Sequence, residues 1–187
     1  MATAEELIKG AQDKMAKSVE HARSEFSTVR TGRASASLLD RIEVDYYGTP
    51  TPLRQLSTIN VPEPRMLTVQ VFDPSSIKAI EKAIQESDLG LTPSNDGKLI
   101  RLPIPQLTEE RRKELVKLVR GVAEEGRVAV RNVRRDVIHH LKELVDKGEV
   151  GADDEHRAEG RVQELTDDHT KQIDELLKHK EAEVMEV

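Results

Sequence analysis

The longest regular pattern in the chain predicts a single helix of roughly 40 residues, from Leu107 to about Asp146. Apolar or small residues recur there at alternating steps of three and four, which is the spacing of a heptad seam. The expected seam comprises Leu115, Val119, Val122, Gly126, Ala129, Val133, Val137 and Leu144, with His140 and Leu141 bracketing one step. At about 1.5 Å per residue this helix would be on the order of 60 Å long, so the other segments are expected to pack along it.

Two further segments share the same period. The first runs from about Thr3 to Arg30, and its expected seam is Ile8, Ala11, Met15, Val19, Ala22, Phe26 and Val29. The second runs from about Asp153 to near the C-terminus, with a seam of Ala158, Val162, Leu165, His169, Ile173 and Leu176. Three helices with matching seams predict an elongated three-helix bundle built from residues 1–30 and 106–187.

Residues 31–105 have a different pattern, typical of a small mixed domain. Polar and apolar residues alternate over 41–47 and over 66–72, and each segment predicts a half-buried strand. A further strand through Leu56, Ile59 and Val61 is expected to stop at Pro62 and Pro64, and residues 48–52 are expected to form a turn or extended loop.

A helix is predicted in the same segment from Asp73, its N-cap, to about Ser87, and it should bury Ile77, Ile80 and Ile84. A hairpin should follow over 91–102, turning at residues 95–97. The sequence therefore predicts an α+β protein in which a β/α/β domain is inserted between the first and second helices of the bundle.

The chain crosses between the two predicted domains twice. Glycine at one crossing and proline at the other predict a two-stranded hinge, which restricts rotation to few axes. The hinge residues are expected to be Arg30, Thr31, Gly32 and Arg33 at the first crossing, and Pro103, Ile104, Pro105 and Gln106 at the second.

Composition narrows the possible chemistry of the 187-residue chain. There is no cysteine, which excludes disulfides and thiolate catalysis, and no apolar run reaches the length of a membrane span. Phosphate-cradling glycine loops and the common hydrolase and metalloprotease motifs are missing. His139 and His140 are adjacent and do not share a helix face, and His169 is expected to be buried in a seam. We therefore expect a cytoplasmic protein that is not an enzyme and holds no cofactor or metal.

A row of cations on the long helix is the most informative chemical feature. The net charge is −6, yet residues 108–135 carry nine Lys or Arg against five Asp or Glu. The row comprises Lys113, Lys117, Arg120, Arg127, Arg131, Arg134 and Arg135, and is expected on the side opposite the seam.

Two interpretations of this row remain open. It is either a solvated face balanced by the protein's own ion pairs or a face that binds a nucleic-acid phosphate backbone. The second is favoured because Arg131, Arg134 and Arg135 have almost no acidic partner three or four residues away on their own helix. Arg30 and Arg33 either extend the basic surface or cap the end of the first helix. No aromatic residues interleave with the row, so base stacking is not expected.

Five blocks of sequence resemble those of bacterial ribosome recycling factors. They are Arg-Thr-Gly-Arg-Ala-Ser at 30–35, Tyr-Tyr-Gly-Thr-Pro-Thr-Pro-Leu at 46–53, Ser-Asp-Leu-Gly-Leu at 87–91, Leu-Thr-Glu-Glu-Arg-Arg-Lys at 107–113, and Val-Ala-Val-Arg-Asn-Val-Arg-Arg-Asp at 128–136. The blocks occur in the family's order and cover essentially the whole chain. One departure lies at the second crossing, where Gln106 follows Pro105 and many members have two adjacent prolines.

The resemblance implies an L-shaped molecule and a role after translation termination. Members of the family, with elongation factor G and GTP, split the post-termination ribosome into subunits and free it from mRNA and deacylated tRNA. Their bundle lies on the 23S rRNA of the large subunit. Arg131, Arg134 and Arg135 match the family's rRNA-contacting arginines. Further candidates on this chain are Arg127, Arg120, Lys117, Arg112 and Arg30.

The partners implied are the large ribosomal subunit and elongation factor G, with no membrane and no DNA, and the protein is expected to be a monomer. The alternative is a coiled-coil adaptor whose seam pairs with another chain, and such a protein would be a dimer.

Overall fold

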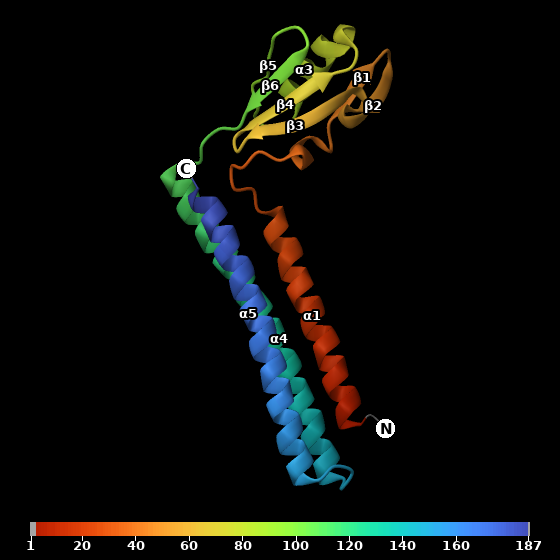
Figure 1. The fold of residues 1–187 in the computed structure, drawn as a ribbon, viewed down its shortest axis with the longest axis vertical. Helices are drawn as coiled ribbons and strands as arrows, with labels where there is room; N and C mark the ends of the chain where they lie inside the picture. Colours follow the sequence, from red (N-terminus) through yellow and green to blue (C-terminus); the bar gives the residue numbers. More distant parts are fainter. Residues whose placement is uncertain (1–2, 187) are drawn as a thin grey trace. The chain divides into compact units, whose positions relative to one another are not determined.

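The computed structural model describes residues 3–186, which form two compact units (Figure 1). One unit is helical and contains residues 3–30 and 109–186; the other contains residues 31–108 and holds all the strands. The predicted α+β class with two domains is confirmed. The unit boundaries lie between Arg30 and Thr31 and between Thr108 and Glu109.

The helical unit is a bundle of α1 (Ala4–Thr28), α4 (Glu109–Asp146) and α5 (Ala152–Met185). α1 and α5 each run antiparallel to α4 (Figure 1). Thr3 begins α1 with a capping box, in which its hydroxyl accepts from the Glu6 amide and the Glu6 carboxylate accepts from the Thr3 amide. Every expected seam residue of α1 is buried, so the heptad pattern correctly identified its inner face.

The predicted seam of α4 is only partly right. Ala123 and Val130 are fully buried, whereas Val122, Ala129 and Val133 are half-buried and His140 is exposed. α4 packs against two neighbours, so its apolar face is broader than the single stripe of a two-stranded coiled coil. The centre of that face therefore lies beside the predicted seam, toward α5.

α5 shows a smaller difference of the same kind. Thr166 is buried where Leu165 was expected, and Leu165 and Leu176 are half-buried. The Thr166 hydroxyl donates to the Val162 carbonyl at 2.8 Å, which satisfies its polar atom inside the core. His169 is buried as predicted, with its Nδ1 2.6 Å from the Leu165 carbonyl oxygen.

The second unit contains two antiparallel sheets. β1 (Glu43–Tyr46) and β2 (Thr49–Pro52) form a hairpin, and a four-stranded sheet has the order β3-β4-β6-β5. Its strands are β3 (Ser57–Glu63), β4 (Met66–Val71), β5 (Ser94–Asn95) and β6 (Leu99–Pro103). The alternating segments and the hairpin turning after Asn95 are thus confirmed.

Two expectations for this unit were wrong. Residues 49–52 are a strand and not a loop, because Tyr47 (φ +49°) and Gly48 (φ +82°) both adopt left-handed conformations and reverse the chain in two residues. β3 also continues through Pro62, since the register with β4 shifts between Asn60 and Glu63 and Pro62 needs no ladder hydrogen bond there.

The helices of this unit cover its core. α3 (Ile77–Glu86) buries Ile77, Ile80 and Ile84 as predicted. It follows the 3-10 turn η2 (Pro74–Ser76), whose start is capped by the Asp73 carboxylate through the Ser75 amide at 3.0 Å. The short segments η1 (Ala36–Leu39) and α2 (Leu53–Leu56) were not predicted.

Both crossing segments are tied to the turn between β3 and β4. The Ala34 amide donates to the Pro64 carbonyl at 2.7 Å, and the Ile104 amide donates to the Arg65 carbonyl at 2.8 Å. Gly32 has φ +76°, and a Cβ there would lie 3.1 Å from the Leu107 side chain. Pro103 and Ile104 are therefore anchored in this unit by its sheet and by the adjoining turn.

Candidate nucleic-acid interface

Three arginines of the row, Arg120, Arg127 and Arg134, lie along the border of α4 with α5, and not on the side opposite the seam. Arg120 donates from Nε to Glu181 at 2.6 Å, and Arg127 donates from Nε to Asp174 at 2.7 Å. Both acceptors are on α5. The expected position opposite the seam is wrong because that seam was centred too far from α5.

Arg127 is the most enclosed arginine of the row. Its side chain is 20% exposed and also donates to Glu124 at 3.2 Å. Burial alone would lower the pKa of Arg127, but hydrogen bonds and charge from Asp174 and Glu124 outweigh burial and raise the pKa above its ordinary value. Arg127 is therefore a compensated cation that joins two helices.

Arg131 shares its acidic partner with Arg127. Its guanidinium lies 3.3 Å from Glu124, which is seven residues earlier on the same helix, and its side chain is 46% exposed. Glu124 thus divides its charge between two guanidiniums, and Arg131 is less fully compensated than Arg127, which also has Asp174 as a partner. Arg120, Arg127 and Arg131 thus have acidic partners on this chain, so the interpretation of the row as a face balanced by the protein's own ion pairs holds for these three arginines.

Arg134 and Arg135 differ from the arginines before them. Arg134 donates to the neutral amide oxygen of Gln163, on α5, at 3.0 Å. Arg135 is exposed, and the described part of the chain gives it no ion pair. Together with Arg131 they form what we call the arginine cluster, defined as residues 131, 134 and 135.

The other candidates are scattered. Lys117 is exposed on α4, and Arg30 is exposed just beyond α1. Arg112 is half-buried near the start of α4, and its Nε is a buried donor without a hydrogen-bond partner among residues 3–186. Arg30 follows the end of α1, whereas the arginine cluster lies in the second half of α4, so Arg30 does not belong to the cluster.

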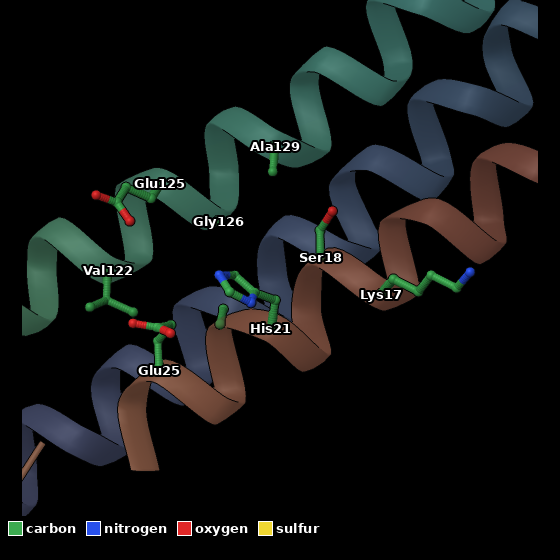
Figure 2. A pocket seen from close by; sticks show the side chains of 9 residues that line it. Lys17, Ser18, His21, Glu25, Val122, Glu125, Gly126 and Ala129 are labelled. Atoms are coloured by element: carbon green, nitrogen blue, oxygen red, sulfur yellow. The ribbon is translucent and has the colours of Figure 1, made fainter. Parts of the chain in front are cut away.

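The other flank of α4, toward α1, is hollowed by two grooves. One has a cavity volume of about 360 Å³, and Figure 2 shows its lining: Lys17, Ser18, His21 and Glu25 from α1, with Val122, Glu125, Gly126 and Ala129 from α4. The second, of about 380 Å³, lies further along the same helix pair and includes Val133 and Asp136. Cations and carboxylates are mixed in both grooves, so neither offers a surface of one sign to a polyanion.

Sequence reasoning missed the contribution of α5. Gln163, Asp174 and Glu181 decide which arginines are compensated, and none of them belongs to a basic motif. The one available signal was spacing: Arg120, Arg127 and Arg134 are seven residues apart, as are Asp167, Asp174 and Glu181. Matching heptad positions on two helices predict ion pairs across their border.

Two features are absent from the described residues. Residues 3–186 contain no group of three or more His, Cys, Asp or Glu side chains that could hold a metal ion. Within the same range no helix is long and apolar enough to cross a membrane.

Comparison with known proteins agrees with the fold. The family model described as ribosome recycling factor matches residues 22–185. A ribosome-recycling factor of Rubrobacter xylanophilus is 57% identical over 180 residues, which cover 96% of this chain and 97% of that one.

Solved structures show the same relationship. A solution structure of a ribosome recycling factor is similar with a TM-score of 0.72, at 43% identity and full coverage of both chains. A second match, with a TM-score of 0.63 and 45% identity, covers 99% of this chain and 100% of the other. That structure belongs to models of the T. thermophilus ribosome recycling factor and the E. coli elongation factor G bound to the E. coli post-termination complex.

The fold and these matches define a translation factor without enzymatic activity. Within that class, the chain belongs to the ribosome recycling factor family.

Proposed function

We propose that this protein, acting with elongation factor G and GTP, splits the post-termination ribosome into subunits and releases it from mRNA and deacylated tRNA. The support is its family and its similarity to the T. thermophilus factor that is placed with elongation factor G on a post-termination complex. In this role the protein works in the cytoplasm.

The bundle, in our proposal, docks on 23S rRNA of the large subunit through the arginine cluster. One observation carries this assignment: Arg134 is held by a neutral amide and Arg135 has no ion pair in the described chain, so both charges remain available. An arginine already paired with a carboxylate gains less from a phosphate, because that pair must first be broken. Arg120 and Arg127 therefore contribute mainly by joining α4 to α5, and Lys117 adds positive charge nearby.

The bundle serves as a stiff lever and the small domain as the part that elongation factor G pushes. The seams of α1, α4 and α5 are filled by one another, and Met15, Val119 and Ile173 are each 0% exposed. Among residues 3–186 the heptad seams are thus used within the bundle, which favours a monomer over the coiled-coil adaptor.

The pivot is proposed at residues 30–33 and 105–108. Pro103 and Ile104 were expected to belong to the hinge, but their hydrogen bonds to the β3–β4 region favour a pivot that begins after them. Gly32 remains in the proposed pivot. Its φ of +76° lies in the left-handed region, which glycine adopts readily and proline cannot adopt.

Replacing Arg134 with Ala tests the docking face. Binding to purified large subunits should weaken, and the plot of log affinity against log salt should become shallower by about one phosphate contact, a slope change of roughly 0.7 to 0.9. The measurement is sedimentation of the variant with large subunits across a salt series.

Arg23→Ala is the matched control, because Arg23 is an exposed arginine on α1 that pairs with Glu20. This control should bind like the wild type. If Arg134→Ala bound with unchanged affinity and unchanged salt slope, the docking face would have to lie elsewhere.

A further inference from the structure

The border between α4 and α5 contains a ladder of three equally spaced rungs. Arg120 faces Glu181, Arg127 faces Asp174, and the same antiparallel register places Arg134 opposite Asp167. From one pair to the next, the residue number rises by seven on α4 and falls by seven on α5. A heptad spacing on both helices keeps all three rungs on one side of the border.

The third rung is built differently from the first two. Arg120 and Arg127 reach their carboxylates directly, at 2.6 and 2.7 Å. Arg134 instead meets the Gln163 side chain, whose own amide nitrogen donates to Asp167 at 2.9 Å. Gln163 is thus inserted between the cation and the acid.

The chemistry of the amide sets its orientation. A carboxylate accepts but does not donate, so the Gln163 amide group must turn its NH₂ toward Asp167. Its carbonyl oxygen then faces Arg134, whose guanidinium only donates. Asp167 therefore aligns Gln163, and Gln163 aligns Arg134, without a direct contact between the two charges.

We infer that Gln163 is a positioning residue for anion binding: it holds the Arg134 guanidinium in place on the bundle surface while leaving its charge uncompensated. The ligand is a phosphate of an RNA backbone, and the inference rests on the docking face proposed above. A glutamate at this position would complete the ladder and neutralise the arginine, as happens at the two earlier rungs.

Gln163→Glu tests the inference with a change of little more than one atom. The new carboxylate should pair with Arg134, lower large-subunit affinity about three- to fivefold at low salt, and make the salt slope shallower, toward that of Arg134→Ala. The melting temperature should stay nearly unchanged, because residue 163 is exposed and its new pair with Arg134 offsets repulsion from Asp167.

Two variants separate charge from structure. Gln163→Ala keeps Arg134 charged but releases it, so the salt slope should match the wild type while the affinity falls by about two- to tenfold, the cost of ordering one long side chain on binding. An affinity equal to that of the wild type would show that Gln163 does not position Arg134. Gln172→Glu adds the same charge to α5 on the opposite side of that helix, nine residues further on, and should leave the slope unchanged.

The outcomes distinguish this inference from the proposed function. If Arg134→Ala weakens binding but Gln163→Glu leaves the slope at the wild-type value, Gln163 has no positioning role. If Arg134→Ala has no effect, the docking face itself is wrong. If Gln163→Glu and Gln172→Glu reduce the slope equally, only net charge matters, and the inference is overturned.

Discussion

The two flanks of α4 are sealed in different ways. Toward α5, the side chains of Arg120 and Arg127 lie across the border, and their charged ends meet carboxylates. Toward α1, half-buried Val122 and Val133 line open grooves, and no comparable ladder occurs among the described residues. Long arginine stems can cover apolar surface while their heads stay in water, so the α5 flank is closed without a wider apolar face.

The two flanks of α4 therefore depend on different properties of their side chains. The α1 flank depends on volume, because small residues there set how closely the helices approach. The α5 flank depends on charge, and the charge left over at its far end is what we assign to RNA. Changes of volume should therefore act on stability, while changes of charge at the cluster should act on binding.

The largest effect is expected where α4 is closed on all sides. Val130→Asp should lower the free energy of unfolding by about 3 kcal/mol or more, because Val130 is 0% exposed and a carboxylate there loses water without gaining a partner. Val133→Asp should cost only about 1 kcal/mol, since the groove lets the new side chain reach solvent. Denaturant unfolding measures both values. Equal costs for the two variants would show that the groove beside Val133 is closed.

An intermediate effect is expected at Gly126, where side chains of α1 and α5 come close to the backbone of α4. A Cβ on Gly126 would lie 3.1 Å from the Ile173 side chain and 3.3 Å from the Ala22 side chain. Gly126→Val should therefore destabilise the bundle by about 1–3 kcal/mol through overpacking. Gly121→Val is the matched control on the same helix, where a Cβ would meet nothing within 4 Å, and it should be neutral or slightly stabilising. Thermal melts that ranked the two variants equally would contradict the close approach of the three helices.

The smallest effect concerns the ion pair between α1 and α5. Arg161 donates to both oxygens of Glu5, at 2.6 and 3.0 Å, and this hydrogen bonding, together with the charge of Arg161, lowers the pKa of Glu5 from its ordinary value of 4.5. A folded-state pKa below the unfolded value gives stability that is present above pH 4.5 and is lost as the pH falls through the folded pKa.

Glu5→Gln should consequently melt slightly lower than the wild type at neutral pH, and the difference should shrink as the pH falls below 4.5 and through the folded-state pKa. Melting curves at a series of pH values provide the measurement, and Arg161→Gln should reproduce the same trend. A difference that persisted unchanged in acid would mean that Glu5 is not stabilised through its charge.

Local periodicity predicted much of this fold because it depends on neighbours within a turn or two. The buried face of α1 and the isoleucines of α3 follow directly from steps of three and four. The hairpin of β1 and β2 was not predicted, because Pro50 and Pro52 are typical of a loop. An edge strand nevertheless tolerates proline, and β2 contains both of them. The seam of α4 was displaced because one stripe cannot represent a helix with two neighbours.

The candidate site was predicted less completely than the fold. Arg134 and Arg135 were identified from the scarcity of acids on their own helix, and the structure gives neither a carboxylate partner within residues 3–186. That criterion did not reveal the α5 partners of Arg120 and Arg127, because these partners lie 61 and 47 residues away in the chain. A search confined to one helix has no access to such pairs.

The sequence by itself determined the three helices, the inserted β domain and the resemblance to ribosome recycling factors, because these follow from local spacing and from ordered blocks of residues. Only the tertiary structure decided which cations remain uncompensated. That outcome depends on the antiparallel register of α5 against α4, which brings Glu181 and Asp174 to two arginines and a neutral Gln163 to the third. A charge is compensated by whatever lies within a few ångströms of it, and the packing of distant segments sets that neighbourhood.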